Sequence, residues 1–506
     1  MGGKAKDFAA ASPEEKRALL VDLLRKRAGS GRRTGPLSFA QERLWFLDRL
    51  IREKAIYNIP AAVRLAGQLN LEALKQSINE IRRRHETLRT TFSDVGGQPV
   101  QIIGPPEPLP LALKDLSGLP EAEREKEARR LVDGEAREPF DLARGPLLRI
   151  QAVRLGPEDH IVMLTMHHII SDGWSMRVLI RELVLLYNAY VNEQPSPLQD
   201  LPLQYADFAL KQRARLQGDA LEEHLTYWRQ HLEGLPPLLK LPNDKPRPQA
   251  QRFLGATQSV ALPEELTEPL RSVGRRAGTT LVTTLCACLK VLLAHWSGQD
   301  DIVVGTPVAG RQELETEGLI GFFVNTLVIR TRISGDPSFR VLLAQVREVM
   351  LEAQAHQDLP FEKLVEALQP ERSMSHLPLF QVLFSCMNAE RETLRLHGLT
   401  LRDFGALSGT AKLDLEMLVI ETTPRIYVTL HYDTDLFEPA TITRLLRHFE
   451  ALLQHIVTQP DARLSQLRAM LIEVDRRQQA VEEQELTQAR QQKFERVRRR
   501  NLGGST

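Results

Sequence analysis

An apolar run that ends in two adjacent histidines constrains this chain more than any other sequence feature. Residues 161–166 read IVMLTM and predict a short buried strand, and His167 and His168 follow at once. After a tight turn at Asp172, residues 174–190 carry apolar side chains at helical spacing. A strand, a turn and a helix in this order predict an α/β fold. Because side chains at the carboxyl ends of strands in open α/β sheets meet the substrate, we expect the candidate site here.

The two histidines differ in their expected surroundings. Adjacent side chains on a strand point to opposite faces, so one imidazole faces a substrate cavity and the other packs behind it. An imidazole titrates near neutral pH, which suits the removal of a proton from an attacking amine or alcohol. Asp172 is placed either to orient the loop through a charge pair or to cap the next helix. A core histidine pair followed by an ordinary helix cap would give the same segment, and both interpretations stand at this point.

Hydrophobic periodicity and proline content divide the 506 residues into five regions. We expect a lead-in helix and linker over 1–35, an N-terminal lobe over 36–190, a proline-rich and irregular connector over 191–252, a C-terminal lobe over 253–473 and a polar linker or tail over 474–506. Helices are predicted over 71–81 with Asn70 as the N-cap, and over 121–130, 280–296 and 439–456; strands are predicted over 100–103, 301–305, 324–330 and 380–386, with a hairpin at 415–421 and 426–431.

The composition excludes several classes of function. The 66 basic and 65 acidic residues leave a net charge of +1, so neither nucleic acid nor a membrane surface is the expected partner. No signal-peptide pattern and no 18-residue apolar stretch occur, and we expect a soluble, cytoplasmic protein. Three cysteines cannot form a disulfide framework, and Cys286 and Cys288 are expected core residues. The histidines lack companions at metal-ligand spacing and no Gly-rich phosphate loop is present, so no bound cofactor or metal is expected.

Eight segments in a fixed order give the histidine loop a family context. They are SFAQERLWFL (38–47), RHETLRTTF (84–92), MHHIISDGWS (166–175), YADFA (205–209), GTPVAGR (305–311), IGFFVNT (320–326), HQDLPFE (356–362) and SHLPLF (375–380). Over about 36–460 the chain resembles a condensation domain of a nonribosomal peptide synthetase, in which the histidine loop is the HHxxxDG motif. One departure is that the tryptophan usually found just after the fourth segment is replaced.

The resemblance implies a fold and a reaction. The fold would be two chloramphenicol-acetyltransferase-like lobes in a V around a central tunnel. The reaction would be amide (peptide) bond formation between a carrier-bound acyl or peptidyl thioester donor and a carrier-bound aminoacyl acceptor. Both substrates would arrive on phosphopantetheine arms, one from an upstream and one from a downstream carrier protein. An adjacent adenylation domain and a monomeric isolated domain are also implied, while the donor, the acceptor and the product stay open.

The resemblance also assigns residue roles in the histidine loop. His168 would be the histidine that faces the tunnel, with His167 and Asp172 as structural members of the motif. Asp172 would pair with Arg311, and Gly173 would keep room for substrate beside the imidazole. Whether His168 acts as a general base or only positions the amine is left open. The backbone N–H of Gly173 is a candidate to stabilise a developing oxyanion.

Further support residues are implied around this loop. Asn325 and Arg43 would hold the lobes and the loop together, and Trp174 and Ser175 would be further support residues of the active site. His85, at a helix end, is interpreted as a packing or capping residue instead of a second base.

Related families and a different class of function were weighed against this assignment. Epimerisation domains differ downstream, where residues 320–326 follow the condensation pattern, and heterocyclisation domains carry aspartates in place of the two histidines. Plant-type acyltransferases use Asp-Phe-Gly-Trp-Gly, whereas residues 403–405 here are followed by Ala-Leu and are interpreted as a turn at a strand edge. The remaining alternative is a non-catalytic condensation-like platform that recruits carrier proteins or tailoring enzymes.

Overall fold

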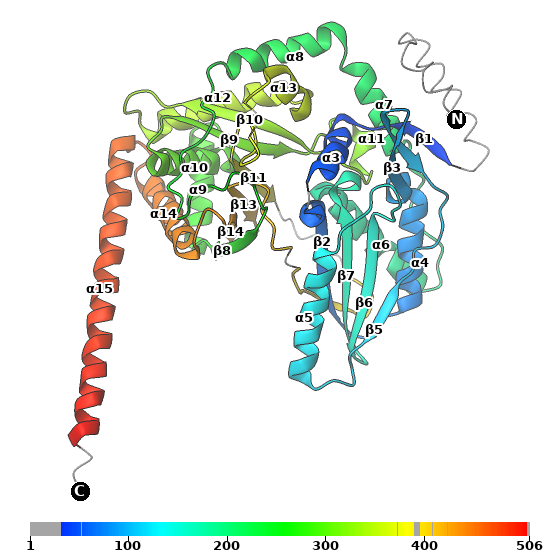
Figure 1. Cartoon of the computed structure of the whole chain (residues 1–506), viewed down its shortest axis with the longest axis horizontal. Helices are drawn as coiled ribbons and strands as arrows, with labels where there is room; N and C mark the ends of the chain where they lie inside the picture. The colour runs from blue at the N-terminus through cyan, green and yellow to red at the C-terminus, as the bar shows by residue number, and fades with distance from the viewer. Residues whose placement is uncertain are drawn as a thin grey trace.

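The chain forms two α/β halves that lie side by side, each built around its own sheet (Figure 1). The structure, a computed structural model, describes residues 32–502 apart from 52, 372, 389–394, 407 and 423, with side chains omitted for 482 and 485–502. The lead-in helix expected near residue 12 lies outside the described residues. The mixed α/β architecture in two halves agrees with the expected fold class.

The N-terminal half holds a five-stranded sheet and a small three-stranded one. Its elements are β1 (Arg33–Pro36), α3 (Phe39–Leu50), η2 (Lys54–Tyr57), β2 (Asn58–Ala66), α4 (Leu71–Arg84), η3 (Glu86–Arg89), β3 (Thr90–Val95), β4 (Gln98–Ile103), β5 (Ala112–Asp115), α5 (Glu121–Arg137), β6 (Leu148–Gly156), β7 (Asp159–His167), η4 (His168–Ile170) and α6 (Gly173–Val191). The large sheet has the order β12-β2-β7-β6-β5, in which β12 (Thr400–Asp403) comes from the second half of the chain, and the small sheet has the order β1-β4-β3.

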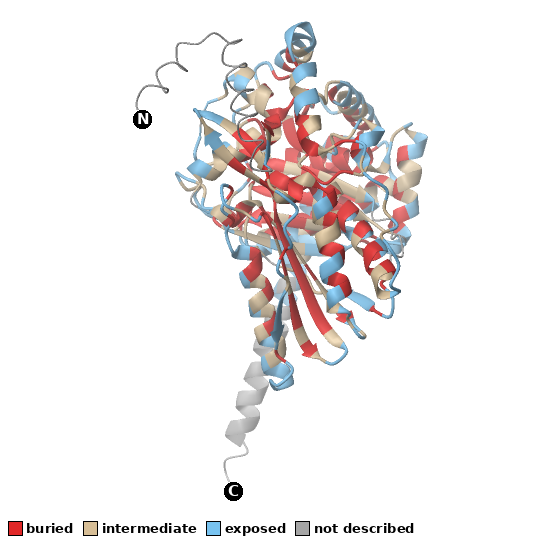
Figure 2. Cartoon of the chain, turned by 90° about the vertical axis from the view of Figure 1, so that its right-hand side faces the viewer, coloured by how far each residue is buried: buried red, intermediate tan, exposed pale blue. Residues whose placement is uncertain are grey.

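Strand β7 is apolar because both of its faces are covered. Val162, Leu164 and Met166 pack into the cluster that includes residues of α4 and α6, whereas Ile161 and Met163 pack against α5 on the other face. Strands buried on both faces read as continuous apolar runs instead of alternating ones. Figure 2, which looks onto this half, shows the buried residues running along the central strands. The strand predicted from the run 161–166 is thereby confirmed and extended to Asp159–His167.

The C-terminal half is a six-stranded mixed sheet with the order β10-β9-β11-β13-β14-β8. Its elements are β8 (Gly255–Ala261), α9 (Glu264–Arg276), α10 (Leu281–Ser297), β9 (Asp301–Val308), α11 (Leu314–Glu317), β10 (Asn325–Arg332), α12 (Phe339–Ala355), α13 (Phe361–Leu368), β11 (Val382–Asn388), β12 (Thr400–Asp403), β13 (Leu415–Glu421), β14 (Ile426–Asp433) and α14 (Pro439–Thr458). The predicted hairpin is confirmed, since β13 and β14 pair in antiparallel register.

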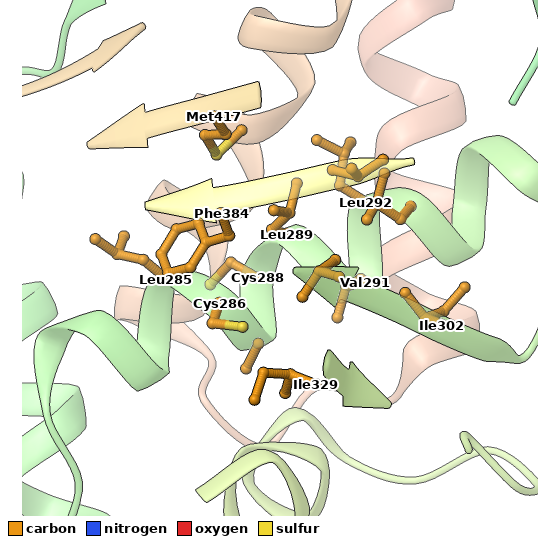
Figure 3. Packing of buried hydrophobic residues seen from close by; sticks show 14 of the residues in the cluster. Leu285, Cys286, Cys288, Leu289, Val291, Leu292, Ile302, Ile329, Phe384 and Met417 are labelled. Carbon is orange, nitrogen blue, oxygen red and sulfur yellow. The ribbon is translucent and has the colours of Figure 1, made fainter. Parts of the chain in front are cut away.

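Helix α10 is buried on nearly all sides and forms the centre of this half. Cys286 and Cys288 are both fully buried free thiols, as expected, and Figure 3 shows them among leucines and Phe384. Lys290 is buried in the same helix, where its ammonium donates to the carbonyls of Ile302 and Ile329 at 3.1 and 2.7 Å. These bonds satisfy a charge that is otherwise costly inside an apolar core.

Three regional expectations need correction. The connector 191–252 is not irregular throughout, because it contains α7 (Tyr205–Arg215) and α8 (Gly218–His231). The predicted lead-in, 1–35, overlaps the folded part of the chain, because β1 begins at Arg33 and pairs with β4. The polar tail after 474 is the continuation of one helix, α15 (Leu464–Leu502), which extends away from the body in Figure 1. Polar helices are difficult to tell from linkers when no apolar stripe marks them.

A segment of the second half completes the sheet of the first. Strand β12 pairs with β2 at the sheet edge, so the region expected to form only the C-terminal lobe crosses back to the N-terminal half. The turn interpreted at 403–405 is confirmed as the end of this edge strand, where the N–H of Gly405 donates to the Asp403 carboxylate at 3.0 Å. Arg129 of α5 holds the end of β12 by donating hydrogen bonds to the carbonyls of Phe404 and Gly405 at 2.8 and 2.9 Å.

Within the described part of the chain, no single helix has the length and apolarity of a membrane span, and the bent pair α9 and α10, at 96°, is the one combination that passes on length and composition.

We expect Arg129→Ala to lower the free energy of unfolding by about 1–3 kcal/mol, because it leaves two carbonyls without a donor and removes a cation–π contact with Phe404 at 4.0 Å. Urea denaturation measures the change. Arg130→Ala is the matched control, because Arg130 is an exposed neighbour that pairs with Glu127 on the same helix, so its unfolding curve should superpose on that of the parent. Equal stability of the two variants would contradict this role of Arg129.

Candidate active site

The two histidines lie at the junction of β7 and the short turn η4. His167 is the last residue of β7 and is buried, and its Nδ1 accepts a hydrogen bond from the N–H of Ile169 at 3.1 Å. His168 begins η4, so the backbone turns between the two rings. His167 therefore packs behind the loop, against Tyr57 and Phe140, while His168 lines a cavity. The expected division between the two rings is present, but it comes from the turn into η4 and not from strand alternation, because β7 ends at His167.

The His168 imidazole is held by packing more than by hydrogen bonds. Its ring meets the edge of Phe322 at a centroid distance of 4.8 Å. Its Nδ1 is buried and has no hydrogen-bond partner among the described residues. A buried nitrogen without a partner is uncommon in folded proteins, and the contact with Phe322 is what holds the ring on this side.

Both imidazoles are neutral at physiological pH. Burial lowers the pKa of His167 to about 3, and the nearby ammonium of Lys412 acts in the same direction. Burial likewise lowers the pKa of His168 to about 3, again with Lys412 as the next cause. A buried ring next to a cation loses both the hydration and the potential that would stabilise an imidazolium.

Asp172 is the centre of the hydrogen bonds that hold the loop. It is buried and is the N-cap of α6, where its Oδ1 accepts from the N–H of Ser175 at 2.8 Å. Its Oδ2 accepts from the N–H of Phe323 at 2.9 Å, and the guanidinium of Arg311 lies 3.4 Å from Oδ1. The expected pair of Asp172 with Arg311 is therefore present, and both of the roles considered for this carboxylate apply.

Arg311 and its neighbours connect the loop to the other half. Its guanidinium donates to Leu319 O at 2.8 Å, to Ser175 Oγ at 2.9 Å and also to Thr316 O. Burial lowers its pKa, although Asp172 raises it. Ser175 also exchanges hydrogen bonds with the backbone of Gly321, at 2.8 and 3.0 Å. The start of α6 is thus fixed to the segment that precedes β10.

Three further support residues join elements that are distant in sequence. The indole N–H of Trp174 donates to Glu317 O at 2.9 Å. Arg43 of α3 pairs with Glu362 of α13 at 3.4 Å, which links the two halves directly. The Asn325 amide donates to the carbonyls at 357 and 359, both at 2.8 Å, and accepts from the N–H at 361. Asn325 therefore holds the loop that leads into α13.

The histidine loop opens into a cavity of about 1320 Å³ between the two halves. Its N-terminal walls come from α3, η2 and residues 168 and 172–174, and its C-terminal walls come from the ranges 250–253, 307–309, 322–326, 373–387 and 412–418. No one half encloses the space, so the cavity depends on how the halves are joined.

Sequence reasoning missed Tyr57 and Lys412, which both face this cavity near the histidines. Neither belongs to a recognised segment, and a single lysine between strands carries no sequence signal. His85 was interpreted correctly as a packing and capping residue, since it is buried at the end of α4 and its Nε2 lies 3.0 Å from Glu182. No group of three or more potential ligands is placed to hold a metal ion in the part of the chain that is described.

A family model described as the condensation domain matches residues 32–479. The chain belongs to the condensation-domain family. One of the linear gramicidin synthase proteins of Brevibacillus parabrevis is 48% identical over 448 residues, which are 88% of this chain and 6% of that protein. Phosphinothricin tripeptide synthetase PhsC of Streptomyces viridochromogenes is 42% identical over 91% of this chain and 43% of its own length. This condensation domain therefore spans less than half of either synthetase.

Solved structures show the same fold. The X-domain from teicoplanin biosynthesis superposes on this condensation domain with a TM-score of 0.77 at 29% identity, covering 85% of this chain and 96% of its own. The chloramphenicol-acetyltransferase-like α/β fold expected from the resemblance is thus confirmed, and the recognised family is that of nonribosomal peptide synthetase condensation domains.

We expect Asp172→Ala to lower the free energy of unfolding by about 3–5 kcal/mol, because Arg311 would keep a buried charge without its carboxylate. Urea denaturation measures the loss, and Asp200→Ala, whose side chain is 95% exposed, should leave stability unchanged. In a double-mutant cycle, Asp172→Ala with Arg311→Met should lose less than the sum of the two single variants. Strict additivity would show that the two residues are not coupled.

We expect the stability of the domain to fall as pH falls from about 6.5 to about 3. The unfolded chain binds protons at histidine near pH 6.5, whereas His167 and His168 stay neutral in the folded state down to about pH 3. Each such histidine adds up to about 1.4 kcal/mol per pH unit to the slope. Chemical denaturation across this range should show a shallower slope for His168→Ala and an unchanged slope for Gln76→Ala, which replaces an exposed side chain that does not titrate. Parallel curves for all three proteins would contradict the neutral imidazole.

Proposed function

We propose that this domain catalyses amide bond formation between a carrier-bound acyl or peptidyl thioester and a carrier-bound aminoacyl amine. The observation that carries the proposal is the neutral imidazole of His168, which faces a cavity walled by both halves. A thioester is already activated, so the enzyme needs no covalent intermediate. Holding two tethered reactants together supplies a large part of the acceleration, on the order of 7–11 kcal/mol in favourable cases.

His168 acts in this scheme as a hydrogen-bond acceptor for the attacking amine. With a pKa of about 3, the ring is too weak a base to take a proton from an ammonium group, whose pKa is near 8 for an α-amine. It is well suited to accept a hydrogen bond from a neutral amine, which aims the nitrogen lone pair at the thioester carbon. His167 and Asp172 serve as positioning residues, because His167 lies behind the loop and the carboxylate of Asp172 is already engaged by Ser175, Phe323 and Arg311.

The start of α6 stabilises the oxyanion of the tetrahedral intermediate. Gly173 is the first residue of this helix and lines the cavity, and N–H groups in the first turn of a helix have no intrahelical acceptor. The helix dipole adds a partial positive charge at this end. Gly173 also keeps this space open, since a side chain here would project towards Met387, whose terminal carbon lies 3.9 Å from the position of a Cβ.

The partners of the domain follow from the same scheme. The donor and acceptor arrive on phosphopantetheine arms of an upstream and a downstream carrier protein, and an adenylation domain that loads a carrier lies nearby. A four-domain nonribosomal peptide synthetase that was solved bound to AMP and glycine contains a region of the same fold, with a TM-score of 0.78 over 85% of this chain. The regions 36–190 and 253–473, joined by 191–252, remain our proposed lobes, with β12 exchanged between them.

A non-catalytic platform is the second candidate. It is favoured by the likeness to an X-domain that was solved in complex with OxyB, at 28% identity and a TM-score of 0.77. The complete histidine loop and the open cavity at His168 argue for catalysis, because a recruiting surface has no use for either.

We expect His168→Ala to abolish condensation while the fold stays intact. The assay incubates each protein with a panel of aminoacyl and acyl donors and aminoacyl acceptors on separate carriers, and intact mass spectrometry reads the product. His397→Ala, whose exposed ring does not line the cavity, should retain activity. Full turnover by folded His168→Ala would refute the assignment, and carrier binding without any product in the parent protein would favour the platform.

A further inference from the structure

A series of buried hydrogen bonds runs from the start of α3 to the segment that carries Phe322. Tyr205, the first residue of α7, donates its hydroxyl proton to the carbonyl of Phe322 at 2.5 Å, and Ser38 Oγ lies 2.8 Å from the same phenol oxygen. A phenol has one proton and a carbonyl only accepts, so Ser38 donates to Tyr205. Ser38 Oγ in turn accepts from the N–H of Gln41 at 3.1 Å. We call this series, from Gln41 through Ser38 and Tyr205 to the Phe322 carbonyl, the Tyr205 relay.

The Tyr205 relay is buried along its whole length. Ser38 and Gln41 are 0% exposed and Tyr205 is 1% exposed. Burial raises the pKa of the Tyr205 phenol, so the phenol keeps the proton that it donates. The phenol ring packs against Phe208 and Phe323, at centroid distances of 5.5 and 4.9 Å. A buried polar network whose members are all paired makes the arrangement of the segments that it joins specific and rigid.

The peptide group between Phe322 and Phe323 is held on both of its polar sides. Its carbonyl accepts from Tyr205, and its N–H, which belongs to Phe323, donates to Asp172 Oδ2 at 2.9 Å. The backbone at Gly321 lies directly against the Tyr205 ring, because a Cβ at that position would come within 2.0 Å of a ring carbon. With both polar groups bonded, this peptide is fixed in one orientation, which sets the direction of the Phe322 side chain.

Both ends of the Tyr205 relay reach the turn that carries His168. At one end, the ring of Phe322 meets the His168 imidazole at a centroid distance of 4.8 Å. At the other end, the side-chain amide of Gln41 donates to the carbonyl of Ile169, the residue after His168, at 3.1 Å. Because Nδ1 of His168 has no hydrogen-bond partner among the described residues, packing supplies the orientation of the ring that a hydrogen bond at this nitrogen would otherwise give.

We propose that Tyr205 is a positioning residue that orients the His168 imidazole in the cavity by way of Phe322. This inference rests on the proposed function and deepens it, since it gives a helix of the connector a part in the active site. Removal of the Tyr205 hydroxyl leaves the Phe322 carbonyl without its donor and allows the peptide to tilt about its remaining bond to Asp172. An imidazole that moves with Phe322 no longer aims the amine at the thioester carbon. A misplacement of about 1 Å can lower a rate by roughly 10²-fold.

The first test compares the removal of two buried tyrosine hydroxyls. Tyr205→Phe removes the donor to Phe322 and keeps the ring, and Tyr187→Phe is the matched control. Tyr187 is also 1% exposed and its phenol oxygen accepts from the N–H of Asn70 at 3.0 Å, but it does not line the cavity. With the donor and acceptor pair that gives the fastest turnover in the panel, we expect kcat to fall by roughly tenfold or more in Tyr205→Phe, with KM within about twofold of the parent value. Tyr187→Phe should keep both kinetic constants, although it also loses a buried hydrogen bond.

The second test needs no substrate. Histidine labelled with ¹³C at Cε1 reports the surroundings of His168 by NMR in the unliganded domain, with the resonance assigned by its loss in His168→Ala. Phe322→Leu should shift this resonance, because the ring current of a neighbouring aromatic side chain is lost. Tyr205→Phe should shift or broaden it as well, whereas the resonance should stay in place in Tyr187→Phe. In a double-mutant cycle, Tyr205→Phe with Phe322→Leu should lower kcat by less than the product of the two single effects, since both act on the same contact.

The outcomes separate this inference from the proposed function. A changed His168 resonance in Tyr205→Phe without turnover by the parent protein supports the inference and rejects amide formation. An unchanged resonance overturns the inference, even if the parent protein is fully active. A change in KM alone, or equal losses of kcat in Tyr205→Phe and Tyr187→Phe, also overturns it, because the hydroxyl would then affect only binding or stability. If Tyr205→Phe does not fold, Ser38→Gly removes the donor to Tyr205 at an N-cap position where glycine is well tolerated, and the same change of the His168 resonance is expected.

Discussion

The buried carboxylate of Asp172 is the contact on which the rest of the site depends. It caps α6, accepts a hydrogen bond from the backbone N–H of Phe323 and pairs with the guanidinium of Arg311. Those partners belong to a segment far along the chain that packs against the N-terminal half. A buried ion pair contributes little net stability compared with apolar packing, but removal of one partner lowers the free energy of unfolding strongly, because the other charge stays buried. Its value here is geometric, since one side chain sets the direction of the histidine loop and the position of the opposite wall.

The two halves are joined by a strand that crosses from the second half to the first and by side-chain contacts between them. Strand β12 from the second half extends the first sheet, and Arg129 holds its end. The pair of Arg43 with Glu362 connects α3 and α13 near the cavity. Because these links come from several elements, the cavity walls keep a defined separation, as the proposed condensation of two tethered reactants requires.

Burial and fixed cations define the electrostatics of this site. Both imidazoles are neutral, and the groups around His168 oppose any gain of positive charge. For the proposed reaction, such surroundings favour the neutral form of the attacking amine over its protonated form.

The amino-acid sequence by itself determined the α/β class, the strand at 161–166, the helix that follows it and the family, and the resemblance to that family named His168 as the histidine that faces the cavity. Those features rest on local periodicity and on short ordered motifs, which neighbouring residues encode. The motif resemblance also anticipated the pair of Asp172 with Arg311. The tertiary structure alone decided that β12 crosses to the first sheet, that α7 and α8 occupy the connector and that Lys412 and Tyr57 stand beside the histidines. Contacts between distant segments depend on packing and strand register, and no local spacing in the chain specifies which lysine will meet which imidazole.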